Sequence, residues 1–173
     1  MKRAELEDLL RELARVLGKR EVAMIGSQCV HAATNAPPAE VLMSRECDIL
    51  VEDSDPVREL IDTELGEASP YHEEFGTFVD TVSPSFPFLP DGWEQRTNVL
   101  VSGEMRSRCL ELHDLVLSKL AAGRLKDNEL IAALIHYKLV DVATARDRIA
   151  AVADLHMRAI LLARLQIVLE NVD

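Results

Sequence analysis

Apolar side chains recur every three or four positions in the first part of the chain. Between Arg3 and Leu17 they fall on one helical face, and Gly18 follows directly. This spacing predicts an amphipathic helix that ends at the glycine, because glycine readily adopts the left-handed backbone at a helix C-terminus. The first predicted element is therefore a helix that packs on a core through one face.

Short apolar runs after this helix predict the strands of a sheet. The run Glu21 to Ile25 is followed at once by Gly26-Ser27 and a stretch of small residues. That order predicts a strand, a tight turn and the start of a helix. Further strands are predicted in the segments 46–51, 75–82, 97–101 and 105–110, and the proline-containing segment 35–43 and the acidic segment 69–74 are predicted as loops.

The pattern becomes helical after residue 111, with helices predicted around 113–122, 126–138, 142–153 and 157–169. This order of elements predicts an α+β fold in which residues 1–110 form an α/β core and residues 111–173 form a C-terminal helical region packed on that core. The last helix is apolar around most of its circumference. It is therefore either deeply buried or the contact surface of a homodimer.

The chain is acidic, with 19 Lys and Arg against 30 Asp and Glu and a formal charge of −11. The imbalance is steepest from Glu40 to Glu94, where Arg45 and Arg58 are set against 15 carboxylates. Such a stretch repels a phosphate backbone, so a broad nucleic-acid-binding surface is not expected there. A cation site suits this segment better.

Two other features of the composition narrow the class of protein. No apolar run approaches the roughly 18 residues of a membrane span, and the first residues lack the apolar centre of a secretory signal. We therefore expect a cytoplasmic protein without a membrane partner. The three cysteines are widely spaced and odd in number, which favours reduced thiols over disulfides or a zinc site.

The alternation in the segment 46–51 places two acids together. Glu46 and Asp48 share one strand face, whereas Cys47 points to the other. Two carboxylates on one face can share Mg²⁺, a hard cation that also bridges the phosphates of a nucleotide. Asp80, on another predicted strand, is a candidate third carboxylate that completes the metal site or orients an attacking hydroxyl.

Several motifs occur in the order typical of one superfamily. Gly26-Ser27 follows the first strand, Glu46-x-Asp48 lies on the next, and the stretches LPDGWEQR and LHDLVLSKLAAGRLKD come later. On these residues the chain resembles the nucleotidyltransferase-like superfamily, and within it a bacterial branch whose members are largely of unknown function. The resemblance covers about residues 20 to 135.

This resemblance implies a mixed β-sheet flanked by helices, and transfer of a nucleoside monophosphate from an NTP to an acceptor with Mg²⁺ or Mn²⁺. Related branches modify antibiotics, proteins or tRNA, and some members are toxins of bacterial toxin–antitoxin or abortive-infection systems. The acceptor is accordingly expected to be a small molecule, a protein or tRNA. The predicted metal ligands are Glu46, Asp48 and Asp80, and Asp80 is also the predicted catalytic residue.

The remaining site predictions concern phosphate and proton contacts. Backbone N–H groups at Gly26 and Ser27 would hold a phosphate, with the Ser27 hydroxyl added. Lys119 can meet the triphosphate as a point charge, and the resemblance implies that Arg124 and Asp127 belong to the same motif. The structural alternative is an ion pair between Arg124 and Asp127 at a helix junction.

Other roles are open for several of these residues. His72, which precedes two glutamates, is a candidate metal ligand or proton carrier, or else it organises its own loop. Glu46 and Asp48 could form a solvated strand face, and Asp80 could cap a turn. The superfamily usually has aspartate where this chain has Glu46. The alternative function is therefore a catalytically inactive nucleotide- or protein-binding module of the same fold.

Overall fold

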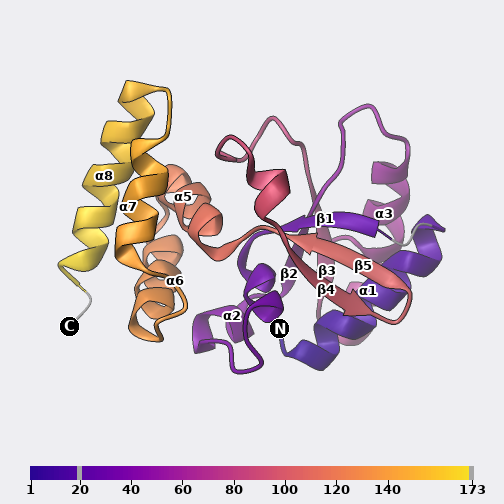
Figure 1. Ribbon diagram of the computed structural model, residues 1–173. Helices are drawn as coiled ribbons and strands as arrows, with labels where there is room; N and C mark the ends of the chain where they lie inside the picture. Colours follow the sequence, from indigo (N-terminus) through magenta and orange to yellow (C-terminus); the bar gives the residue numbers. More distant parts are fainter. Residues whose placement is uncertain (19–20, 172–173) are drawn as a thin grey trace.

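A five-stranded mixed sheet organises the part of the chain that the computed structural model describes, residues 1–18 and 21–171 (Figure 1). The strand order is β3-β2-β1-β5-β4. Strand β1 runs antiparallel to β2 and parallel to β5, β3 runs parallel to β2, and β4 runs antiparallel to β5. The strands are β1 (Glu21–Ile25), β2 (Glu46–Leu50), β3 (Phe78–Val82), β4 (Asn98–Ser102) and β5 (Met105–Cys109). The predicted α+β class is confirmed.

One face of this sheet is covered by α1 (Arg3–Leu17) and α3 (Val57–Leu65). Helix α1 contacts β4 and β5, α3 contacts β3, and the two helices contact each other. The predicted first helix is confirmed, and Gly18 follows it with a φ of +57°. The side chains that α1 buries are Leu6, Leu9, Leu10 and Leu13. Their i, i+3, i+4 and i+7 spacing is the reason that this segment folds as a core-facing helix.

The C-terminal helices gather to one side of the sheet (Figure 1). They are α5 (Leu112–Ala122), α6 (Leu125–His136), α7 (Val142–Ala150) and α8 (Leu155–Leu169). Helix α5 contacts each of the other three. The predicted boundary at residue 110 falls between β5 and α5, but the division into two domains stays a prediction. Its ranges include residues 19–20 and 172–173, which lie outside the described residues.

Three local predictions differ from the structure. The segment after Gly26 forms a short 3₁₀ helix, η1 (Ser27–Ala32), and the predicted loop 35–43 contains α2 (Ala39–Met43). The predicted loop 69–74 is largely α4 (Pro70–Phe75), so β3 begins three residues later than expected. Helix α4 forms because Ser69 accepts a hydrogen bond from the His72 N–H and proline occupies the first turn. A second 3₁₀ turn, η2, spans Trp93–Arg96.

Helix α8 is buried on one side only. Leu161, Leu165 and Val168 pack into the core, whereas Leu155 is 71% exposed and Leu162 and Ile167 are also exposed. The helix is thus half-buried, and the predicted homodimer stays a prediction that light scattering can test. Across residues 1–18 and 21–171, the structure contains no helix with the length and apolar character to cross a membrane.

A buried charge cluster ties the segment after Pro90 to the helical region. Asp114 of α5 is fully buried and accepts a hydrogen bond from Arg96 Nε at 2.8 Å and another from Arg148 of α7. Arg96 also donates to the Asp91 carbonyl at 3.0 Å. This cluster fixes η2 against α5, the helix that carries Lys119.

Replacing one cation of this cluster is expected to be moderately destabilising. In Arg96→Met, Arg148 still neutralises Asp114, so the loss should be that of a charge-assisted hydrogen bond, about 1.5–3 kcal/mol. Arg106→Met is a matched control, because Arg106 is exposed on β5. Urea unfolding of both variants measures the difference, and equal stability would contradict a structural role for Arg96.

Candidate functional site

Two aspartates lie side by side on neighbouring strands. Asp48 of β2 is the register partner of Asp80 in the parallel pair formed with β3. Cys47 is fully buried on the opposite face, as the alternation of β2 predicts. Glu46, Asp48 and Asp80 therefore start from one face of two adjacent strands.

The turn after β1 brings backbone against one of these carboxylates. Gly26 has a φ of +77° and a ψ of −170°, a conformation that glycine adopts almost exclusively. A Cβ atom at Gly26 would lie 1.8 Å from Asp48 Oδ2. The neighbouring Ile25 is the register partner of Asp48 across β1 and β2. Gly26 is needed for the turn and also for the close approach of the Asp48 carboxylate.

The environment of Asp48 disfavours its charged form. Burial raises the pKa of Asp48 to about 6, and the negative charges of Glu46 and Asp80 act in the same direction. The positive charges of Lys119 and Arg124 oppose this rise. Partial burial, followed by repulsion from Glu46 and Asp62, also raises the pKa of Asp80. A cation placed between the two aspartates would relieve this repulsion.

Basic side chains from α5 and the start of α6 face the acids. Arg124 binds Asp127 through Nε at 2.7 Å and Nη2 at 3.2 Å, and Lys119 Nζ lies 3.5 Å from the same carboxylate. Asp127 is buried, which alone would raise its pKa, but the hydrogen bond from Arg124 and the charge of Lys119 hold that pKa below its usual value. The structural ion pair is confirmed, and it holds both cations in place.

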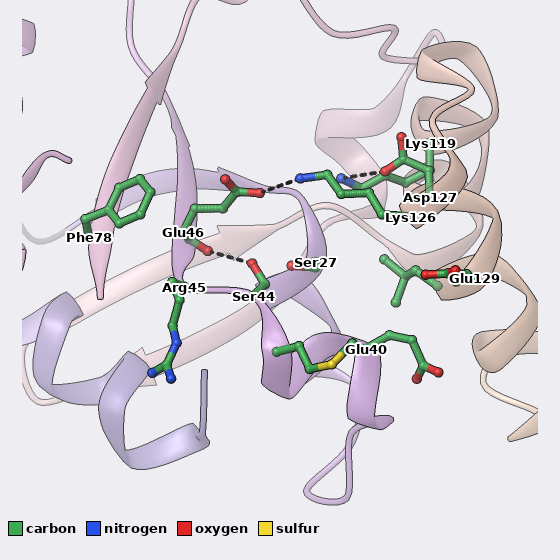
Figure 2. A pocket seen from close by; sticks show the side chains of 12 residues that line it. Ser27, Glu40, Ser44, Arg45, Glu46, Phe78, Lys119, Lys126, Asp127 and Glu129 are labelled. Carbon is green, nitrogen blue, oxygen red and sulfur yellow. Dashed lines mark hydrogen bonds and ion pairs between the residues drawn. The ribbon is translucent and has the colours of Figure 1, made fainter. Parts of the chain in front are cut away.

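Glu46 has a partner on the helical region. Its carboxylate accepts a hydrogen bond from Lys126 Nζ of α6 at 3.4 Å, while its backbone carbonyl accepts from Ser44 (Figure 2). Lys126 is largely exposed, so this contact is a surface ion pair of modest strength. Glu46, one of the three predicted metal ligands, thus has a cation of the protein as its partner.

Two hollows meet at Lys119. One, of about 430 Å³, is lined by Gly26, Asp48, Asp80, Lys119 and Arg124. Apolar side chains line the same hollow, among them Val82, Phe86, Pro87, Phe88 and Met157. The second, of about 280 Å³, is lined by Ser27, Glu46, Lys119, Lys126 and Asp127 (Figure 2). Eight of the nine predicted site residues therefore line one hollow or the other, and Lys119 lines both.

Two predicted residues have local partners instead. The buried Ser27 hydroxyl accepts a hydrogen bond from the side-chain amide of Gln28 at 3.3 Å. His72 Nδ1 accepts one from the Ala68 N–H at 2.9 Å, and its ring lies 4.7 Å from that of Phe78. His72 does not line either of the two hollows, and it lies in α4 rather than in a loop. Its role as a metal ligand or proton carrier stays a prediction.

The sequence analysis missed Phe86 and Met157, which line the larger hollow. Met157 lies on α8, and the packing of α8 against α5, α6 and α7 places it in this hollow. The sequence contains a signal for Phe86, because the segment 84–87 places an aromatic residue between two prolines. Such a segment is constrained and unsuited to a strand.

The side chains that can act as metal ligands determine which cation the site can bind. Within the part of the chain that the structure describes, no three His, Cys, Asp or Glu side chains are grouped to hold a metal ion. The Asp48 and Asp80 carboxylates alone fit Mg²⁺ or Mn²⁺, because Mg²⁺ usually takes one or two carboxylates and completes its shell with water and substrate phosphates. The residues thus suit a metal that arrives with a nucleotide.

The structure combines a mixed sheet, a glycine turn beside two aspartates, and basic side chains from the neighbouring helices. These features are typical of a nucleotidyltransferase-like protein. The chain belongs to a family described as nucleotidyltransferases of unknown function (DUF6036), whose model matches residues 4–162. The resemblance stated from the motifs is thereby confirmed. Searches of curated proteins and of solved structures gave no match.

Proposed function

We propose that this protein is an enzyme that transfers a nucleoside monophosphate from an NTP to an acceptor, with Mg²⁺ or Mn²⁺ as cofactor. The observation that carries the proposal is the pairing of Asp48 with Asp80 beside Gly26, in one hollow with Lys119 and Arg124. Carboxylates for a divalent cation, on β2 and β3, and cations for phosphates, on α5 and at the start of α6, then line one hollow. The family description supports the same general role.

Each side chain has a distinct part in this proposal. Asp48 and Asp80 would hold the metal, which polarises the phosphate oxygens when it is bound. Asp80 is the more exposed of the two and is therefore the carboxylate that can accept a proton from the acceptor hydroxyl. Lys119 and Arg124 would contact the triphosphate, held by Asp127 in the positions that this requires.

The acceptor stays open among a small molecule, a protein and tRNA. The acidity of the segment 40–94 limits any nucleic acid to a small contact rather than a broad surface. A toxin–antitoxin or defence context stays a prediction from the resemblance.

A thermal-shift matrix of the purified protein against each NTP, with Mg²⁺, Mn²⁺ or EDTA, tests the proposal. An NTP at about a hundred times its dissociation constant should add roughly 2.7 kcal/mol of stability, and only when a divalent cation is present. Mg²⁺ alone should add little, because two carboxylates are an incomplete shell. Asp80→Asn is expected to remove the metal-dependent part of the shift. A shift that persists in EDTA would contradict the metal dependence, and no shift with any NTP would contradict the proposal.

The alternative, an inactive module of the same fold, is favoured by one observation. The Glu46 carboxylate is paired with Lys126, which leaves two carboxylates at the pair itself. Such a module would bind an NTP in the thermal-shift matrix without transferring it. Incubation with NTPs labelled on the α-phosphate separates the two, because only the enzyme would release pyrophosphate and label an acceptor.

A further inference from the structure

Phe86 is an exposed aromatic residue beside the proposed site. Its side chain is 86% exposed, in a chain with only 4% aromatic residues. It lines the same hollow of about 430 Å³ as Asp48, Asp80 and Lys119. An exposed phenylalanine alone would be unremarkable on a surface. Its place in the lining of a hollow that also contains charged side chains indicates a role in ligand binding.

The loop that carries Phe86 is ordered by several contacts. The Phe86 N–H donates to the Ser83 carbonyl at 3.0 Å, which closes a turn. The Ser83 hydroxyl binds the Asp53 carboxylate at 2.8 Å and lies 2.8 Å from the Ser85 hydroxyl. Proline follows Phe86 directly and fixes the backbone further. The ring is therefore presented from a constrained turn, which reduces the entropy that binding would cost.

The hollow itself is amphiphilic. Its lining combines the two aspartates and the two cations with apolar side chains, among them Phe86, Val82, Pro87, Phe88 and Met157. A nucleotide has the same combination, because a charged triphosphate is joined to a flat base with an apolar face. The volume lies within the range of about 300–1,000 Å³ that is common for small-molecule sites.

We propose that Phe86 is the stacking surface for the base of the donor nucleotide. This inference rests on the proposed function and adds how the donor is recognised. Phe86 and the other apolar side chains of the lining are unable to hydrogen-bond the edges of a base. Stacking accepts every base, so the donor preference is broad and favours purines, which have the larger ring face.

Titration calorimetry with ATP, CTP and inorganic tripolyphosphate, each with Mg²⁺, tests this role. In the unsubstituted protein ATP should bind about 5- to 150-fold more tightly than tripolyphosphate. This ratio corresponds to the usual contribution of one stacked base. The affinity for CTP should lie between the other two. Phe86→Ala should remove most of this difference, and Phe86→Tyr should keep it. Tripolyphosphate affinity should be the same in all three proteins.

The matched control is Phe75→Ala, because Phe75 is also exposed but lies on α4 and does not line the hollow. Equal ATP affinity in the unsubstituted protein and Phe86→Ala would overturn the stacking role and leave the proposed function intact. A parallel loss of ATP and tripolyphosphate affinity in Phe86→Ala would also overturn it, since the loop would then act on the phosphate end. If the unsubstituted protein binds neither probe, the proposed function fails, and this inference fails with it.

Discussion

Asp48→Asn is expected to abolish nucleotide binding that depends on a divalent cation, and at the same time to stabilise the ligand-free protein. The first effect follows because a neutral amide replaces one of the two carboxylates that would hold the metal. The second follows because the folded protein raises the pKa of Asp48 from 3.8 to about 6. A charge that the fold disfavours is removed by the substitution.

The pH dependence of this stabilisation has a definite sign. Below about pH 4, Asp48 is protonated in both the folded and the unfolded protein, and the substitution should change little. As pH rises through the window from 4 to 6, the unfolded chain loses its proton first, so the unsubstituted protein loses stability. Above pH 7 the variant should be more stable by about 3 kcal/mol, since one pKa unit corresponds to about 1.4 kcal/mol.

Thermal unfolding in EDTA from pH 4 to pH 8 measures this difference. For a chain of this size, 1 kcal/mol corresponds to roughly 2–4 °C in melting temperature. Asp147→Asn is the control, because Asp147 is exposed on α7 and its replacement should stay within about 0.5 kcal/mol at every pH. A variant that is less stable than the unsubstituted protein at pH 8 would mean that Asp48 has a structural role.

The sequence predicted the site well where a short-range pattern decides the geometry. The face shared by Glu46 and Asp48 follows from the two-residue period of a strand, and their separation from the buried Cys47 follows with it. The pair of Arg124 and Asp127 follows from a three-residue spacing at the start of a helix. These contacts lie within one element and need no knowledge of the fold.

Contacts between elements could not be predicted in the same way. That Asp48 pairs with Asp80 depends on the register of β2 and β3, which are separated along the chain by two helices. The contact of Lys126 with Glu46 depends on where α6 packs. The start of β3 was predicted too early because the aromatic and β-branched residues from Phe75 onward outweighed the helix-start signal of Ser69-Pro70.

The contact between Gly26 and Asp48 joins the fold to the proposed chemistry. Gly26→Ala is expected to destabilise the protein by about 2–6 kcal/mol. The backbone conformation alone costs about 1–3 kcal/mol for a residue with a side chain, and the new methyl group would overlap the Asp48 carboxylate. Urea unfolding measures the loss.

Two further variants separate the two causes. Gly76→Ala places a methyl group at a φ of +70° with no atom within 4 Å, so it should cost only the backbone strain, about 1–2 kcal/mol. Combining Gly26→Ala with Asp48→Ala should recover part of the lost stability, because the overlapping carboxylate is gone, and the coupling should reach about 1–3 kcal/mol. If the effects of the two substitutions on the free energy of unfolding are additive instead, the turn does not make a close contact with the Asp48 carboxylate. The Asp48 carboxylate would then reach the site whether or not residue 26 carries a side chain.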